Sequence, residues 1–283
     1  MIEPKGHSPR GGCQCGGSCH PGKTRTLAPH ELLSMDFSTA TTEDACACGR
    51  HACPRRYLAV TGFILGAFLL LHLTVNALAF WPARFQTAVN TIHGLGATLP
   101  NLEVGLALAL AIHVALGLRA LFREKLNLGV QKHHCGSDVR YWLQRLTAVI
   151  LLVFLSFHLA TMHRWGFHLV YRMTHWPAVE RYAAGGLFEP RRAIASISEA
   201  QWRFWDEHPG NPANLLIVEL YLLGIAAAVY HCANGVATGA EVLEYVTTTR
   251  RKETLWRVCM GAGFVLAAIG MAGWYAFVPG AHN

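Results

Sequence analysis

The chain has 283 residues, of which 52% are hydrophobic and 14% charged, with a mean hydropathy of +0.27. This composition excludes an ordinary soluble globule and indicates a membrane protein. The formal net charge of +7 does not indicate nucleic-acid binding, because most Lys and Arg flank apolar runs, where they set membrane topology.

Residues 1–53 form a polar, Gly- and Cys-rich extension that we expect to be flexible and cytoplasmic. Zinc or an iron–sulfur centre would suit its clustered thiols and imidazoles, although their spacing matches no standard zinc finger and no Rieske motif. Two alternatives stay open: a metal site at the second cluster, which precedes the first span, or a thiol-rich tail that binds no metal. The two clusters are Cys13, Cys15, Cys19 and His20, and Cys46, Cys48, His51 and Cys53.

Residues 54–283 contain five apolar runs, each long enough to cross a hydrocarbon core about 30 Å thick as a helix. The predicted fold class is therefore all-α, a bundle of five transmembrane helices behind the Cys-rich extension. The connection at residues 81–101 is expected to be a short loop, and residues 193–207 a surface helix with Ile194, Ile197 and Trp202 on one side. The predicted spans are residues 57–80, 102–122, 142–165, 215–239 and 256–278.

The distribution of basic residues predicts the orientation in the membrane. Lys and Arg are concentrated before the first span, in residues 119–145 and in residues 250–257, which predicts that these segments are cytoplasmic. All nine cysteines fall in the same segments or in the adjoining halves of the helices, on the reducing side. We therefore expect a multi-pass protein of the inner (cytoplasmic) membrane, with the N-terminus inside and the C-terminus outside.

Each of the first four spans contains a histidine at depth. At 1.5 Å per residue from the cytoplasmic end, His72 and His158 lie about 22 and 24 Å deep, and His113 and His231 about 14 and 12 Å deep. Two imidazoles at one level on neighbouring helices can clamp a flat macrocycle from both faces, as in bis-histidine b-type haem ligation. Glycines in the spans, such as Gly62, would let a porphyrin or a helix approach closely. The alternative for any one histidine is a hydrogen bond within the bundle.

Four segments of the chain resemble a known family. They are similar to the single-chain cytochrome b anchor of succinate dehydrogenases and fumarate reductases (respiratory complex II), of the five-helix, two-haem type. The resemblance covers residue 55 to the C-terminus. The segments are HLTVNALAFWP at 72–82, LPNLE at 99–103 with IH at 112–113, RYWLQRLTAVILLVFLSFHL at 140–159, and YHCANGVATG at 230–239.

The resemblance implies two b-type haems and a set of partners. The partners are the flavoprotein and iron–sulfur subunits, docked on the cytoplasmic face, and a membrane quinone. Some family members carry a glutamate two residues before the fourth-span histidine, linked to transmembrane proton movement, and here that position is Val229. The implied cofactor-binding residues are His113 and His231 for the proximal haem, His72 and His158 for the distal haem, and Trp142, Gln144 and Arg145 near the proximal propionates.

The function implied is electron transfer within an enzyme complex whose dicarboxylate chemistry occurs on a partner subunit. Electrons would pass from the iron–sulfur subunit through both haems to quinone. Glu103 is the candidate proton donor to the quinone, and its alternative is a solvated carboxylate near a helix N-terminus. Two other functions compete: a di-haem anchor of a hydrogenase or another dehydrogenase, and a haem-free transporter or scaffold whose histidines only hold helices together.

Overall fold

The computed structural model of the chain describes residues 54–123, 135–163, 172, 188–202 and 211–279. The chain divides into two units, residues 1–53 and 54–283, and the described residues all belong to the second. Both Cys and His clusters of the extension therefore lie outside the described residues.

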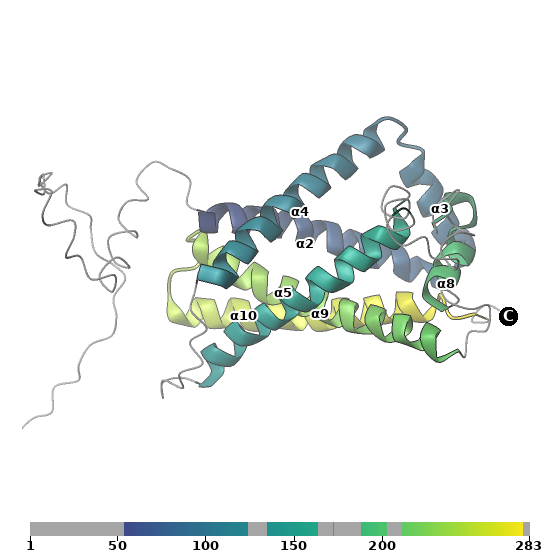
Figure 1. Cartoon of the computed structure of the whole chain (residues 1–283). Helices are drawn as coiled ribbons and strands as arrows, with labels where there is room; N and C mark the ends of the chain where they lie inside the picture. The colour runs from purple at the N-terminus through teal and green to yellow at the C-terminus, as the bar shows by residue number, and fades with distance from the viewer. Residues whose placement is uncertain (1–53, 124–134, 164–171, 173–187, 203–210, 280–283) are drawn as a thin grey trace, which may run out of the picture. The chain divides into compact units, whose positions relative to one another are not determined.

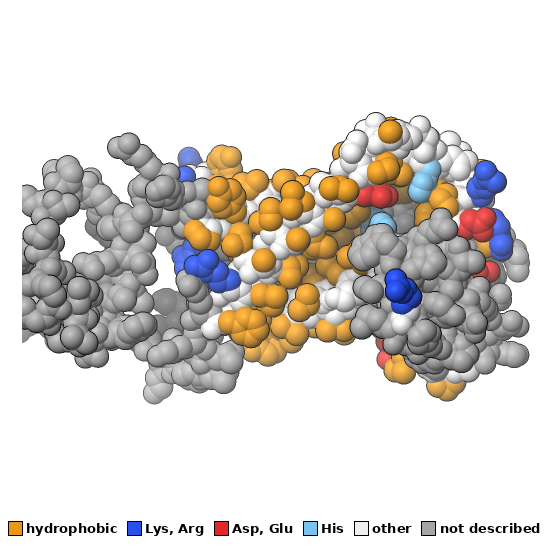
Figure 2. Space-filling model, turned by 45° about the horizontal axis from the view of Figure 1, so that its top comes forward, with side chains coloured by type: hydrophobic (Ala, Val, Ile, Leu, Met, Phe, Trp, Pro, Cys, Tyr) orange, Lys and Arg blue, Asp and Glu red, His pale blue; other side chains and the backbone are white. Residues whose placement is uncertain are grey.

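Every regular element among the described residues is helical, which confirms the all-α prediction. Five helices are long and apolar enough to cross a membrane, as predicted. Their outward faces carry large apolar side chains, and Figure 2 shows these along the middle of the helices, with Lys and Arg at both ends. The five are α2 (Pro54–Ala77), α4 (Thr98–Arg123), α5 (Cys135–Met162), α9 (Pro212–Val242) and α10 (Thr249–Tyr275) (Figure 1).

The helices extend beyond the predicted spans, mostly into the basic flanks. Helix α5 begins at Cys135 and α10 at Thr249, each seven residues before the start of the corresponding predicted span. Hydropathy marks only the stretch that suits hydrocarbon, whereas backbone hydrogen bonding continues the helix through charged residues at the membrane boundary. Lys and Arg tolerate this position because their long stems reach polar surroundings.

Three helices form the packed part of the bundle, and the other two lie against it. Helices α2, α9 and α10 pack on one another, while α4 packs on α2 and α5 packs on α9 (Figure 1). Glycines on α10 allow the close contacts: a Cβ added at Gly263 would lie 2.9 Å from Ala233 Cβ, and one at Gly273 would lie 3.0 Å from the Ala77 backbone nitrogen. This packing fixes the histidine-bearing helices α2 and α9 side by side.

The connection predicted as a short loop contains helix α3 (Pro82–His93), which follows the short 3-10 helix η2 (Leu78–Phe80), so that prediction was wrong. Pro82 suits a first helical turn, and Phe85 and Val89 lie on one face four residues apart. That face packs in a cluster with the end of α10 and with α8 (Ala193–Trp202). The buried cluster consists of Ala79, Phe85, Val89, Ala193, Ile197, Ala276 and Phe277.

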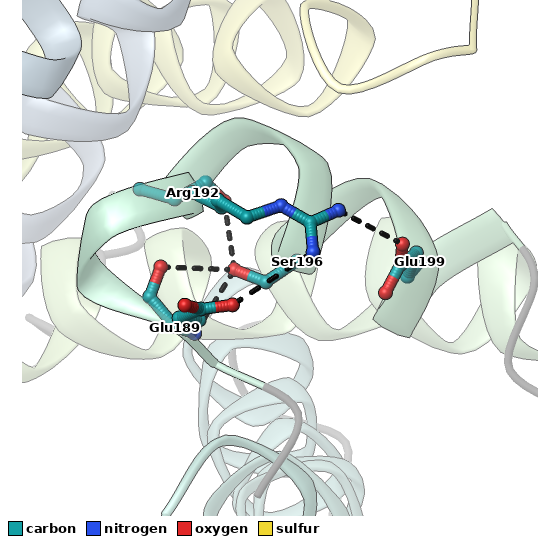
Figure 3. Close-up of polar contacts among 5 residues, drawn as sticks. Glu189, Arg192, Ser196 and Glu199 are labelled. Atoms are coloured by element: carbon teal, nitrogen blue, oxygen red, sulfur yellow. Dashed lines mark hydrogen bonds and ion pairs between the residues drawn. The ribbon is translucent and has the colours of Figure 1, made fainter. Parts of the chain in front are cut away.

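Helix α8 was predicted, but as a surface helix, and that placement was wrong. It is packed into the protein: Ile197 is buried, and Ala200 is buried against α9. The preceding turn η3 (Pro190–Arg192) is held by polar contacts shown in Figure 3. The backbone N–H of Glu189 donates to Ser196 Oγ at 3.1 Å, and Arg192 bridges the carboxylates of Glu189 and Glu199 at 3.9 and 3.8 Å.

Candidate functional site

The four span histidines meet as two pairs of rings. The His72 and His158 ring centroids, from α2 and α5, lie 6.0 Å apart with the ring planes at 81°. The His113 and His231 centroids, from α4 and α9, lie 6.3 Å apart at 79°. The structure thus brings together the same pairs that the depth count predicts.

Both separations fit two imidazoles on opposite sides of one metal ion. A metal–imidazole bond is about 2.0 Å and a ring nitrogen lies about 1.1 Å from its ring centroid, so the two centroids would be about 6.2 Å apart. The measured 6.0 and 6.3 Å lie on either side of that value. By spacing, each pair can therefore hold a haem iron.

The pair formed by His113 and His231, here called the proximal pair, has a partner for one nitrogen of each ring. Thr61 Oγ1 in α2 lies 3.1 Å from His113 Nδ1, and Thr147 Oγ1 in α5 lies 3.3 Å from His231 Nδ1. The Nε2 atoms are then the nitrogens left to bind iron. Gly62 gives His113 its room, because a Cβ there would lie 3.2 Å from Cε1 of the ring.

The pair formed by His72 and His158, here called the distal pair, is bonded differently. His72 Nε2 lies 3.2 Å from Asn76 Nδ2. His158 stacks on Phe154 at 5.5 Å and meets Tyr221 edge to face at 5.8 Å, and its buried Nδ1 has no hydrogen-bond partner among the described residues. Burying such a nitrogen is costly unless something binds it, and a haem iron would. The distal pair thus fits the group by spacing and by this nitrogen.

A chain of amide hydrogen bonds supports the proximal pair from α5, α9 and α10. Gln144 Nε2 donates to the backbone carbonyl of His231 at 3.2 Å, and Gln144 Oε1 accepts from Asn234 Nδ2 at 2.8 Å. Asn234 Oδ1 in turn accepts from Trp256 Nε1 at 3.1 Å. Gln144 was expected near the proximal propionates. It lies on α5, next to His231 on α9, and both its amide nitrogen and its amide oxygen make hydrogen bonds to α9.

Of the other residues predicted for the site, Trp142 and Glu103 are exposed and Arg145 is partly buried. Trp142 is half exposed on α5, and the Arg145 guanidinium lies 4.2 Å from the ring centroid of Tyr141 on the same helix. Glu103 is exposed on the second turn of α4. Roles for these three residues at propionates or quinone stay predictions.

Sequence reasoning missed Thr61, Thr147 and Asn234. A signal for the threonines exists, since Thr61 and Thr147 each stand eleven residues before a span histidine. Eleven residues make just over three whole turns at 3.6 per turn, so each threonine lies on the same face of its helix as the histidine that follows it. Asn234 gives a comparable signal, an amide three residues after His231 within an apolar helix.

Comparison with known proteins relates the chain to a curated membrane-anchor subunit. The chain is similar to the succinate dehydrogenase cytochrome b558 subunit of Bacillus subtilis (strain 168), with 26% identity over 232 residues, 79% of this chain and 96% of that protein. This similarity supports the cytochrome b anchor family. No family model and no solved structure matches the chain.

Proposed function

We propose that this chain is the membrane-anchor electron-transfer subunit of a succinate:quinone oxidoreductase or fumarate reductase. The proposal rests on two pairs of imidazoles from four apolar helices, whose ring centroids lie 6.0 Å apart in one pair and 6.3 Å apart in the other. The similarity to a succinate dehydrogenase cytochrome b558 subunit, along 96% of that protein, supports the same function. The haem-free transporter or scaffold provides no reason for two such matched separations.

In this proposal His113 and His231 hold a proximal b-type haem, and His72 and His158 hold a distal one. A haem bound between two imidazoles supplies reversible one-electron transfer. The protein's part is to hold the ligands. The packing of α2 against α9 fixes the two levels relative to each other, and Phe154 and Tyr221 surround His158 with apolar rings.

We place the electron-entry side at the basic end of the bundle, where the iron–sulfur and flavoprotein subunits would dock. Ion pairs there join α10 to α9, through Lys252 and Glu241 at 3.1 Å, and α2 to the turn after α9, through Arg56 and Glu244 at 3.3 Å. The positive-inside rule makes this the cytoplasmic face. A reporter active only in the cytoplasm, fused after Asn283, should be inactive, and an active fusion would reverse the orientation.

Quinone would be reduced near the distal pair, with Glu103 supplying a proton. Each quinone takes up two electrons and two protons to become a quinol, so a proton donor is required besides the electron carriers. The exposed carboxylate of Glu103, at the same end of the bundle as α3, is our candidate. Its substitution is treated in the Discussion.

The second Cys and His cluster, Cys46, Cys48, His51 and Cys53, which directly precedes the first span in the sequence, is proposed as a zinc or iron–sulfur site. Zinc, iron and acid-labile sulfide should be measured in the complex with and without residues 1–53. Unchanged contents would remove this part of the proposal and leave the haem assignment intact.

The complex purified through this subunit decides the main proposal. We expect a reduced-minus-oxidised spectrum with a b-type α-band, two haems per chain, and succinate:quinone reductase activity. Absence of the α-band would exclude the haem assignment. A b-type spectrum with no succinate- or fumarate-linked activity would favour the anchor of another dehydrogenase or of a hydrogenase.

A further inference from the structure

We propose that Thr61 and Thr147 are positioning residues for the proximal pair. Each accepts a hydrogen bond from Nδ1–H of one imidazole, so that each ring is held as the Nδ1–H tautomer with its Nε2 lone pair free for iron. The inference rests on the proposed function, because it assumes a haem between His113 and His231. Thr61 and Thr147 would then support the proximal haem ligands, whereas the distal ligands have no such threonines.

The hydroxyl geometry assigns the direction of these bonds. Thr61 Oγ1 lies 2.8 Å from the Tyr57 carbonyl oxygen, closer than the 3.1 Å to His113 Nδ1. A hydroxyl has one hydrogen, and the shorter contact to an obligate acceptor takes it. The oxygen lone pairs of Thr61 therefore face the imidazole, and the ring nitrogen is the donor.

The same arrangement recurs at the other ring. Thr147 Oγ1 lies 2.7 Å from the Leu143 carbonyl oxygen and 3.3 Å from His231 Nδ1. Both threonines thus donate to the carbonyl four residues earlier in their own helix and accept from a histidine on another helix. A ligand histidine whose second nitrogen is held by an acceptor is fixed in tautomer and ring orientation.

Sequence spacing shows that one helix face serves both levels. Thr61 stands eleven residues before His72 on α2, and Thr147 stands eleven before His158 on α5. Eleven residues return to the same face about 16 Å further along the helix. Each of these helices therefore presents a distal histidine and, on the same face, the acceptor for a proximal histidine of its neighbour.

The distal pair lacks the reciprocal arrangement. On α4 and α9 the positions eleven residues before the proximal histidines are Leu102 and Leu220, which have no acceptor. Among the described residues neither distal ring contacts a threonine hydroxyl: His158 Nδ1, the nitrogen assigned above to the iron, has no hydrogen-bond partner, and His72 Nε2 contacts Asn76 Nδ2 of its own helix. Of the four histidine rings, only the two proximal ones, His113 and His231, therefore contact a threonine hydroxyl.

An accepted N–H makes an imidazole a more basic ligand, which favours ferric over ferrous iron. Removing either threonine oxygen should raise the midpoint potential of the proximal haem and leave the distal haem unchanged. It should also weaken retention of the proximal haem by about tenfold, the lower end of the effect seen when such supporting partners are lost.

The test is a redox titration, followed by visible absorption, of purified complexes carrying Thr61→Val or Thr147→Val. The proximal haem is identified as the one lost in His113→Ala. Thr61→Ser and Thr147→Ser keep the oxygen and should restore the wild-type potential. Matched controls are Thr74→Val on α2 and Ser156→Ala on α5, whose exposed hydroxyls donate only to carbonyls of their own helices.

A raised proximal potential in both valine variants, restored by serine and absent in the controls, supports the proposal. An unchanged potential in valine variants that retain the proximal haem overturns it, as does an equal shift in the controls. If a valine variant binds no proximal haem, the serine variant at the same position decides the question. Recovery of haem binding in the serine variant supports the role of the hydroxyl oxygen, and no recovery contradicts it. A wild-type complex without b-type haem would instead refute the proposed function itself.

Discussion

The side-chain amide of Gln144 in α5 donates a hydrogen bond to the backbone carbonyl of His231 in α9, over 3.2 Å. The contact ties the start of one span to the backbone of a candidate haem ligand on another. Because Gln144 also accepts from Asn234, which accepts from Trp256, three helices are joined at this level. The imidazole of His231 therefore depends on an amide network as well as on its own helix.

Replacing Gln144 with Leu should destabilise the protein by about 1–3 kcal/mol, because Asn234 and the His231 carbonyl both lose a partner in apolar surroundings. Thermal unfolding of the detergent-solubilised complex measures the loss. Asn101→Leu is the control, since its exposed amide donates to the carbonyl of Ala97, in the turn just before its own helix. Equal destabilisation by both substitutions would contradict the network's role.

Each histidine pair should account for half of the haem. His113→Ala should remove the proximal haem and His72→Ala the distal one, because a haem that lost one of its two imidazole ligands would be held weakly. Haem content per chain, measured as the pyridine haemochrome, gives the result. His93→Ala, whose ring stacks on Phe188 in the connection, should keep both haems. Complete loss of haem from either single variant would argue against two independent sites.

Gly62 should be required for the proximal haem. A leucine there would crowd the His113 ring, since even a Cβ would approach Cε1 to 3.2 Å. We expect Gly62→Leu to lower proximal haem content several-fold while the distal haem stays. Gly105→Leu in α4 is the matched control, because a Cβ at that glycine has nothing within 4 Å. Similar haem content in the two variants would refute the steric argument.

Substitution of Glu103 separates proton delivery from electron delivery. If the carboxyl donates a proton to quinone, Glu103→Gln should slow quinone reduction by about 100-fold while succinate still reduces the haems at the wild-type rate. Glu219→Gln is the control, an exposed carboxylate in the first half of α9. Unchanged quinone turnover in Glu103→Gln would leave Glu103 as a solvated surface group.

The cluster joining α3, α8 and the end of α10 should contribute strongly to stability. Phe85 is 1% exposed and meets Phe277 edge to face at 5.6 Å. Phe85→Ala should therefore cost about 3–5 kcal/mol of unfolding free energy. Phe80→Ala, at a side chain 43% exposed, should cost far less. Thermal unfolding of both variants tests the difference, and equal costs would show that the cluster is not a core.

Much of the membrane architecture followed from the sequence. Long apolar runs have few alternatives to spanning helices, because backbone groups in hydrocarbon must bond within their own segment. The depth count also paired His72 with His158 and His113 with His231, since helical rise is nearly constant. Helix α3 and the burial of α8 could not be read this way, because their short amphipathic patterns are stabilised by tertiary contacts.

The sequence by itself determined the all-helical class, the five spans and the level of each histidine, all of which depend on local composition and a fixed helical rise. The tertiary structure alone decided which groups lie next to those histidines. Thr61 and Thr147 reach the imidazoles of His113 and His231 only because α2 packs on α4 and α5 packs on α9. Contacts between helices depend on crossing geometry and side-chain packing, which a one-dimensional pattern does not contain.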